Sequence, residues 1–243
     1  MESLRIVGVQ LEQSTDLEYN LKRHIEFIRK ESCDLLIFPE CSLVGYNLKN
    51  LEKYKNQKDK RDNLEFAHKK LIDVIKETKK TVIFGSILYD EQQKEIYNCA
   101  FIVSSNQTLV YKKISLTEDE NFLFKPGNKL LSFYLKSKSI VPIVCRDQSN
   151  LDIFKEIKKI NPDLLVILAA HYYYPKDIFW KRYKNIAIPI VRAVDYNINI
   201  LKVNSAGTLE EKISHGNSIY VDKKGITHVI LNEFDEETIK IIL

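Results

Sequence analysis

Three residues that could act together in a chemical reaction each follow an apolar run. Glu40 closely follows DLLIF, Lys113 follows TLVYK and Cys145 follows SIVPIV. Such runs predict buried β-strands, and ligands in open α/β sheets bind beyond the carboxyl ends of the strands. If the three strands are neighbours in the sheet, a carboxylate, an ammonium group and a thiol converge at one edge.

These three groups suit nucleophilic attack on a carbonyl carbon. Cysteine attacks as the thiolate, and a free thiol with a pKa of about 8.5 is mostly protonated near neutral pH. A carboxylate can accept that proton as a general base. A nearby lysine favours the thiolate and stabilises the oxyanion that forms on the attacked carbonyl. The set predicts acyl transfer that needs neither histidine nor a metal ion.

Each of the three residues also has a simpler interpretation. A cysteine at the end of a strand is commonly a small core residue. Glu40, directly after Pro39, is typical of a turn or a helix start. Lys113, beside Lys112, is typical of a solvated sheet edge. Spacing alone does not show that the three side chains meet.

The rest of the chain predicts strands that alternate with helices. Thr15 and Glu18 have the spacing of a capping box at a helix start, and Pro189 is expected to kink or break a later helix. Helices are expected at residues 14–32, 62–79, 151–160 and 176–195, with a polar, lysine-rich loop at 41–61. Because no linker or repeat interrupts the alternation, we expect a layered α/β fold in one domain, residues 1–243.

Composition limits the classes of function. Hydrophobic residues make up 44% of the 243 residues, enough for a sizeable core. The net charge of +4, from 37 basic and 33 acidic residues, argues only weakly for a nucleic-acid or membrane partner. The longest apolar run, 164–170, is far shorter than the ~20 residues that span a bilayer, and the N-terminus does not resemble a signal peptide. We therefore expect a cytoplasmic protein that binds neither nucleic acid nor membrane.

Cysteine and histidine usage predicts no metal and no cofactor. The four cysteines form no C-x-x-C pair, which indicates a reducing compartment. The five histidines are scattered and include no H-E-x-x-H pattern.

Several short motifs, in order along the chain, resemble those of the nitrilase superfamily of carbon–nitrogen hydrolases. DLLIFPE resembles the first motif, which ends in glutamate, here Glu40. YKKISL resembles the lysine motif, with Lys113 at the catalytic place, and ENFLFKPG the segment that supplies a second glutamate, here Glu120. IVCRD resembles the nucleophile motif, with Asp147 two residues after Cys145. Other stretches that resemble family landmarks are VGYN, GSI, YN, VRAVDYN, NSAG and HGNSIYVDKKG.

The resemblance implies a fold and a mechanism. The fold is a four-layer α-β-β-α sandwich of the nitrilase type, commonly assembled as homodimers or larger homo-oligomers through helices. In the implied mechanism, Glu40 accepts the proton of Cys145, which attacks the carbon of an amide. Lys113 and a backbone N–H near Cys145 hold the negative charge that develops, and Glu120 positions the substrate or the polar network.

Some positions depart from the family pattern and bear on the substrate. Members often carry a histidine where Ser115 stands and an aromatic residue where Arg146 stands. Arg146 is expected either to bind a substrate carboxylate through paired hydrogen bonds or to form a surface salt bridge. The aromatic and basic segment 171–183 is expected either to line the pocket, with His171 and Tyr46 as substrate contacts, or to form an oligomer contact.

Three functions remain open at this point. The first is a cysteine-dependent amidase that hydrolyses a small linear amide or carbamoyl compound through a thioester and releases ammonia or an amine. The second is a catalytically silent binding or scaffold protein that keeps the fold. The third is an amidase module that supplies ammonia to a partner synthetase.

Overall fold

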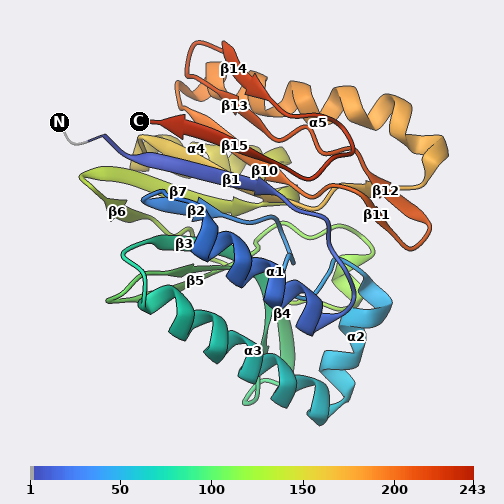
Figure 1. Cartoon of the computed structure of the whole chain (residues 1–243). Helices are drawn as coiled ribbons and strands as arrows, with labels where there is room; N and C mark the ends of the chain where they lie inside the picture. Colours follow the sequence, from blue (N-terminus) through green and yellow to red (C-terminus); the bar gives the residue numbers. More distant parts are fainter. Residues whose placement is uncertain (1–2) are drawn as a thin grey trace.

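The computed structural model, which describes residues 3–243, contains two stacked six-stranded sheets between layers of helices (Figure 1). The strands are β1 (Arg5–Gln10), β2 (Leu35–Ile37), β3 (Thr81–Asp90), β4 (Glu95–Val103), β5 (Thr108–Lys112), β6 (Phe133–Leu135), β7 (Lys138–Val144), β8 (Leu164–Ala169), β9 (Tyr172–Tyr173), β10 (Ile200–Asn204), β11 (Thr208–Leu209), β12 (Lys212–Ser214), β13 (Ile219–Val221), β14 (Thr227–Ile230) and β15 (Glu237–Ile242). The helices are α1 (Leu17–Lys30), α2 (Leu48–Asn56), α3 (Lys58–Lys76), α4 (Leu151–Ile160) and α5 (Pro175–Tyr196), with short 3₁₀ helices at Glu120–Phe122 and Cys145–Ser149.

Each sheet has parallel strands at its centre and antiparallel strands at its edges. The first sheet has the order β15-β1-β2-β3-β4-β5, and the second has β14-β13-β10-β8-β7-β6. Strands β1, β2 and β3 are parallel, as are β7, β8 and β10. Parallel neighbours need a crossover connection, which α1, the α2–α3 pair, α4 and α5 provide. Because both faces are covered, β2 and β8 consist of apolar residues alone.

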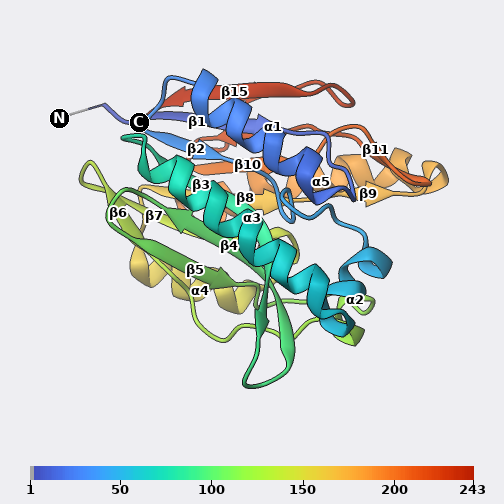
Figure 2. The ribbon, with the colours of Figure 1, turned by 60° about the horizontal axis from the view of Figure 1, so that its bottom comes forward.

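The helices form the two outer layers. Figure 2 shows α1 and α3 lying across one side of the first sheet. A hydrophobic core fills that interface, and includes Phe27 of α1 and Leu71 of α3. A second core extends between the two sheets and outward to α4, where Phe154 is fully buried, and to α5. This arrangement confirms the expected four-layer α-β-β-α sandwich.

The two sheets approach closely where β1 faces β10. A Cβ atom on Gly8 of β1 would lie 2.7 Å from a methyl carbon of Val203 on β10 and 2.7 Å from one of Ile239 on β15. Carbon atoms without a bond between them do not approach so closely, so glycine is required for this spacing between the sheets.

Two predictions about the N-terminal helices are wrong. Helix α1 is capped by Asp16, whose carboxylate accepts the N–H groups of Glu18 and Tyr19, and not by Thr15. Aspartate competes well with threonine at this position.

The predicted loop at residues 41–61 contains α2 and the first turn of α3. Asn47 caps α2 by accepting the N–H of Asn50, and Leu51 and Tyr54 bury one face of that helix. These are the two buried residues of α2, which stand among lysines, so the helical period of its sequence is weak.

Helix α5 continues through Pro189 without a break. Proline has no N–H to donate to the carbonyl four residues earlier, which here belongs to Asn185. Lys202 of β10 replaces the missing donor, with its Nζ atom 2.6 Å from that carbonyl oxygen. A side chain from the neighbouring strand therefore satisfies the carbonyl that the proline leaves without a partner.

A small third sheet, β11-β12-β9, packs beside the second sheet and was not predicted. Its strands have only two or three residues, too few to show an alternating pattern. Across residues 3–243, no helix has the length and apolar character that a membrane crossing requires.

Candidate active site

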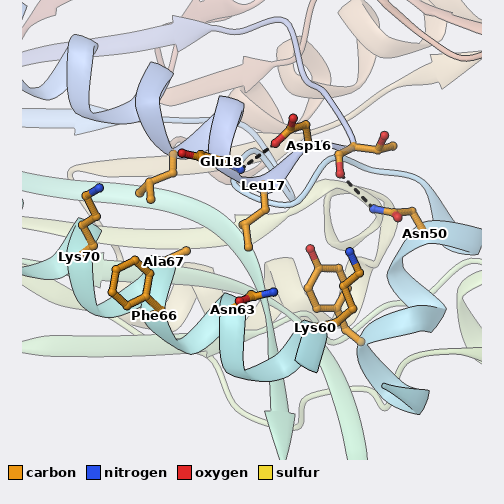
Figure 3. A pocket seen from close by; sticks show the side chains of 12 residues that line it. Asp16, Leu17, Glu18, Asn50, Lys60, Asn63, Phe66, Ala67 and Lys70 are labelled. Carbon is orange, nitrogen blue, oxygen red and sulfur yellow. Dashed lines mark hydrogen bonds between the residues drawn. The ribbon is translucent and has the colours of Figure 1, made fainter. Parts of the chain in front are cut away.

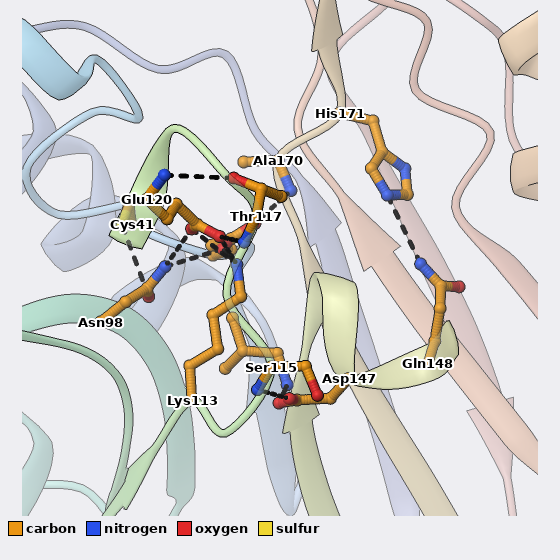
Figure 4. Close-up of polar contacts among 12 residues, drawn as sticks. Cys41, Asn98, Lys113, Ser115, Thr117, Glu120, Asp147, Gln148, Ala170 and His171 are labelled. Atoms are coloured by element: carbon orange, nitrogen blue, oxygen red, sulfur yellow. Dashed lines mark hydrogen bonds and ion pairs between the residues drawn. The ribbon is translucent and has the colours of Figure 1, made fainter. Parts of the chain in front are cut away.

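A buried ion-pair cluster lies beyond the ends of β2 and β5 (Figure 4). The Nζ atom of Lys113 is 2.7 Å from an oxygen of Glu40 and 2.7 Å from an oxygen of Glu120. The second oxygen of Glu120 is 2.9 Å from the same Nζ atom. None of these side chains is more than 1% exposed. Three of the residues that the sequence singled out therefore lie in direct contact.

Other donors complete the contacts of both carboxylates. Asn98 of β4 donates from Nδ2 to Oε1 of Glu40 at 2.8 Å and to Oε1 of Glu120 at 3.3 Å. The backbone N–H of Ala170 donates to Oε2 of Glu40 at 3.0 Å, and that of Thr117 donates to Oε2 of Glu120 at 2.9 Å. Every carboxylate oxygen of the pair has a donor, as buried charges require.

The two carboxylates have different pKa values although they share one lysine. Burial raises the pKa of Glu40; Lys113 opposes this shift and the negative charge of Glu120 adds to it. Burial also acts to raise the pKa of Glu120, but the charge and hydrogen bonds of Lys113 bring it below its ordinary value. Glu40 is therefore the better proton acceptor, and Glu120 stays ionised beside the lysine.

Lys113 keeps its proton in this setting. Burial alone would lower the pKa of Lys113, but the negative charges of Glu40 and Glu120 raise it well above its ordinary value. The cluster thus presents a permanent ammonium group in a buried place, where its field is strong.

Cys145 approaches this cluster from the second sheet, directly after β7. Its φ angle of +42° lies in the left-handed region, which costs a residue other than glycine about 1–3 kcal/mol. The tight turn leaves the side chain partly exposed, whereas the other free cysteines, Cys33, Cys41 and Cys99, are buried.

Opposing effects set the pKa of Cys145. Lys113 lowers the pKa of the thiol, in the direction expected from the sequence. Burial and the negative charge of Glu40 raise it more, so the pKa lies well above its ordinary value. The thiol is therefore protonated at rest, and a reaction at sulfur requires a base that removes the proton during the attack.

Asp147 holds the turn that carries Cys145. Its carboxylate accepts the backbone N–H of Val144 at 3.0 Å, the hydroxyl of Tyr111 at 2.8 Å and the backbone N–H of Ser115 at 2.6 Å. These bonds join the end of β7 to β5 and to the segment that follows Lys113. One buried side chain thus ties the thiol to the strand that leads to the lysine.

Two glycines allow the turns around Glu40 and Lys113 to pack tightly. A Cβ atom on Gly85 of β3 would lie 2.3 Å from the carbonyl oxygen of Pro39, next to Glu40. A Cβ atom on Gly127 would lie 2.2 Å from the carbonyl oxygen of Lys112, next to Lys113. Both neighbours are backbone atoms, which cannot move aside cheaply, so each position requires glycine.

The three strands of the original argument are not neighbours in one sheet. Glu40 follows β2 and Lys113 follows β5, with β3 and β4 between them in the first sheet. Cys145 follows β7 in the second sheet. The groups converge because the two sheets stack, and Asn98 of β4 fills the gap between the two carboxylates.

The three predicted substrate contacts differ in their positions. Tyr46 reaches the cluster, where its hydroxyl forms a hydrogen bond that helps to lower the pKa of Glu120. His171 is buried beside Gln148, with 3.5 Å between their Nε2 atoms. Arg146 is exposed, and within the described chain it forms no ion pair, so the surface salt bridge is not observed. Its contact with a substrate stays a prediction.

Sequence reasoning missed Asn98 and Ala170. A lone amide side chain in the apolar strand EIYNCAFIV is the signal that could have identified Asn98, since a buried polar side chain needs partners. Ala170 acts through its backbone N–H, and no side-chain pattern reports that.

A wide surface groove lies away from this cluster, between α1, α2 and α3 (Figure 3). Its volume is about 670 Å³, and polar residues such as Asp16, Asn50 and Asn63 line much of it. No residue of the ion-pair cluster takes part in it. Within residues 3–243, no group of three or more histidine, cysteine, aspartate or glutamate side chains is arranged to hold a metal ion.

Comparison with known proteins shows what kind of protein has this cluster. The family model described as carbon-nitrogen hydrolase matches residues 5–242. The chain belongs to the carbon-nitrogen hydrolase family. This confirms the resemblance to the nitrilase superfamily that the order of the motifs indicated.

The relatives of this carbon-nitrogen hydrolase are distant. A glutamine-dependent NAD(+) synthetase from Acinetobacter baylyi is 24% identical over 246 residues, which is 98% of this chain and 43% of that protein. A 2-oxoglutaramate amidase from Bacillus subtilis is 24% identical over 212 residues, 85% of this chain and 77% of that protein. The structure of an amidase from Nesterenkonia sp. matches with a TM-score of 0.83 at 16% identity, covering 99% of this chain and 90% of that one. The chain thus spans less than half of the synthetase, and the structural match shows a shared fold.

We expect Asp147→Asn to lower the free energy of unfolding of this hydrolase by about 3 kcal/mol. The amide keeps the shape of the side chain but turns an NH₂ group towards the donors of Val144, Tyr111 or Ser115. Chemical denaturation measures the change. The matched control is Asp152→Asn, because the side chain of Asp152 is 84% exposed, and it should stay within about 0.5 kcal/mol of the parent. Equal stability of the two variants would show that Asp147 does not hold the turn.

Proposed function

We propose that this protein is a cysteine-dependent hydrolase of a non-peptide C–N bond that acts on a small linear amide or carbamoyl compound. The observation that carries the proposal is the Lys113 ammonium, 2.7 Å from both Glu40 and Glu120 and close to the Cys145 thiol. Membership of the carbon-nitrogen hydrolase family supports a hydrolytic reaction. The raised pKa of Glu40 supports its role as the general base.

In the first half of the reaction, Glu40 accepts the thiol proton while the sulfur of Cys145 attacks the carbonyl carbon. A C–S bond forms, and the π electrons of the carbonyl move to its oxygen. Lys113 and a backbone N–H of the turn at Cys145 stabilise this oxyanion. Glu40 then gives its proton to the amide nitrogen, the C–N bond breaks, and ammonia or an amine leaves a thioester on Cys145.

In the second half, water takes the place of the leaving group. Glu40 removes a proton from the water while the water oxygen attacks the thioester carbon. The C–S bond then breaks, the sulfur regains its proton from Glu40, and the carboxylic acid leaves. Glu120 touches Lys113 and not the reacting atoms, so its role is to position the lysine and keep it charged.

The relatives support a primary amide as the substrate. One relative is a glutamine-dependent synthetase and another is a 2-oxoglutaramate amidase. Both compounds are short-chain acids with a terminal amide, and hydrolysis of such an amide releases ammonia. We extend to the present chain only the terminal primary amide that the two compounds share, and neither compound itself.

Replacement of Cys145 tests the proposal directly. Cys145→Ala and Cys145→Ser should each release ammonia at least about a thousandfold more slowly than the parent from its best amide, because no thioester can form. Cys33→Ala is the matched control and should stay within about twofold, since Cys33 is buried outside the cluster.

If both Cys145 variants match the parent, the assignment of the nucleophile is wrong. If the parent itself hydrolyses no amide of a broad panel, and a thiol reagent labels Cys145 no faster than the buried cysteines, the silent scaffold is the better account.

The pH profile tests the roles of the two carboxylates. The rising limb of kcat/KM should have a midpoint above the ordinary glutamate value of about 4.3, because it reports deprotonation of Glu40. The charge of Glu120 raises the pKa of Glu40, so Glu120→Gln should move this limb to lower pH and also reduce kcat about tenfold or more.

The exposed neighbour Glu118 provides the control for that profile. Glu118→Gln should leave both the limb and kcat unchanged. A limb that stays in place in Glu120→Gln would show that Glu40 does not titrate beside a charged Glu120.

We also propose that a second copy of the chain covers the outer face of α5. Trp180, Tyr183, Val191 and Val194 are 48–59% exposed and recur at helical spacing along this face. A twofold axis across the helix would pair the face with itself in antiparallel fashion. The exposed Lys184 of one copy would then approach the exposed Asp195 of the other, which gives complementary charge.

Light scattering measures this assembly. The parent should have the mass of a dimer or a larger oligomer, and Val191→Lys should shift it to the monomer, because the apolar face then carries an unpaired charge. Phe66→Lys, an equal change at a 66% exposed residue of α3, should leave the mass unchanged. A parent that is monomeric at all concentrations would refute the proposal.

A further inference from the structure

A second polar cluster is buried on the α5 side of the second sheet. Its centre is Lys202, a strand residue of β10 with no exposed surface. Within residues 3–243 the ammonium group has no ion-pair partner, and its hydrogen-bond acceptor is the backbone oxygen of Asn185. A lysine has three N–H donors, so this site leaves donors for a further acceptor. A buried ammonium without a counter-anion is costly.

Two buried histidines beside Lys202 also have polar atoms whose hydrogen-bonding capacity is not used. His171 is 6% exposed and His215 is 1% exposed. Within the described residues, the Nδ1 atom of His171 and the Nε2 atom of His215 have no hydrogen-bond partner. The ring of Tyr173 lies between them, with centroids 6.0 Å from that of His171 and 5.7 Å from that of His215. Buried polar atoms are normally paired, so these atoms indicate a ligand that would pair them.

The electrostatics of the cluster also favour the binding of an anion. Burial lowers the pKa of Lys202 to about 7, and only Cys145, when its thiol is ionised, acts against this shift. Burial lowers the pKa of His171 well below its ordinary value, and the positive charge of Lys202 adds to this effect. For His215 the same two causes lower the pKa to about 4. A positive charge on any one of these basic groups disfavours protonation of the others. Within residues 3–243, no ion pair with a carboxylate offsets this repulsion.

This second cluster lies beside the thiol. The short helix that begins at Cys145 separates it from the ion-pair cluster, and Figure 4 shows the neighbours Asp147 and Gln148 on opposite sides of that turn. Asp147 points to Ser115, whereas Gln148 points to His171. His171 directly follows Ala170, whose N–H contacts Glu40. An acyl chain attached to Cys145 would therefore have this cluster within its reach.

We propose that Lys202, His171 and His215 form a subsite for a carboxylate at the far end of the acyl chain, so that the substrates are monoamides of short dicarboxylic acids. This inference rests on the proposed amidase function and adds a substrate class to it. Lys202 donates to one carboxylate oxygen, and the two imidazole rings donate to the carboxylate through the ring nitrogens that now have no partner. Binding of the anion satisfies three buried groups together, and charge-assisted hydrogen bonds of this kind are the strong ones.

Paired substrates test the subsite by kinetics. Succinamate and glutaramate carry the distal carboxylate, whereas butyramide and valeramide have the same chain lengths without it. In Lys202→Met, kcat/KM for the acidic amides should fall roughly 10- to 100-fold relative to the parent. The values for the neutral amides should stay within about threefold, because the reacting groups are untouched.

Lys202 also holds the carbonyl that Pro189 leaves without a helix donor, so a structural effect must be separated from binding. Pro189→Ala supplies an N–H to the Asn185 carbonyl. The double variant Lys202→Met/Pro189→Ala should keep the selective loss for the acidic amides, and Pro189→Ala alone should resemble the parent. If the double variant recovers activity on succinamate or glutaramate, Lys202 is structural and the subsite is refuted.

Arg146 is the rival carboxylate receptor, because it is exposed next to Cys145. If kcat/KM for the acidic amides falls selectively in Arg146→Gln and not in Lys202→Met, the substrate carboxylate binds at the exposed Arg146. The proposed subsite is then wrong. Equal losses on acidic and neutral amides in Lys202→Met would also refute it. The exposed Lys158 of α4 provides a charge control, and Lys158→Met should change no ratio between the substrates.

Calorimetry separates failure of the subsite from failure of the amidase function. Succinate and glutarate should bind to the Cys145→Ala protein, and adding Lys202→Met should weaken that binding at least about tenfold. Binding that depends on Lys202 in a protein that hydrolyses no amide would support the subsite and refute the amidase. Hydrolysis that depends on Cys145 with no preference for acidic amides, and no dicarboxylate binding, would refute the subsite alone.

Discussion

One ammonium group held between two buried carboxylates is the interaction on which this site depends. Lys113 has both Glu40 and Glu120 at 2.7 Å, and without the lysine two negative charges would share a nearly dry space. The positive charge of the lysine allows both carboxylates to be buried together. Their unequal surroundings then give the two carboxylates different pKa values. Glu40 holds its proton more readily than a free glutamate, while Glu120 holds its proton less readily. An asymmetric pair of this kind supplies a base and a fixed counter-charge from the same residue type.

Much of this arrangement could be predicted from the sequence. Apolar runs that are followed by Glu40, Lys113 and Cys145 pointed to groups that the structure brings into one candidate site, and α4 has the bounds expected for it, residues 151–160. Several short motifs, in order along the chain, indicated the nitrilase superfamily. The convergence itself could not be derived from spacing, because it needs two sheets to stack, and the strands that carry the groups are not neighbours. Long-range packing of this kind leaves no local pattern.

Other features could not be predicted because they depend on the backbone or on burial. Ala170 contributes only an N–H, which any residue except proline has. The thiol pKa depends on the balance between burial and three neighbouring charges, so its net direction could not be predicted from Lys113 alone. Lys202 was not singled out from the sequence, although it is a charged residue in the apolar strand INILKVN. Its link to Pro189 through the Asn185 carbonyl became clear only when the strand and the helix were seen packed together.

The division of the candidate site between two sheets has a consequence for newly made protein. Glu40 belongs to one half of the sandwich and Cys145 to the other, and the halves meet at close spacing where Gly8 faces Val203. A chain in which only one half has folded carries a sulfur with no acceptor for its proton and no cation for an oxyanion. Such a chain lacks the partners that the proposed hydrolysis requires, so this activity can appear only after both halves have docked.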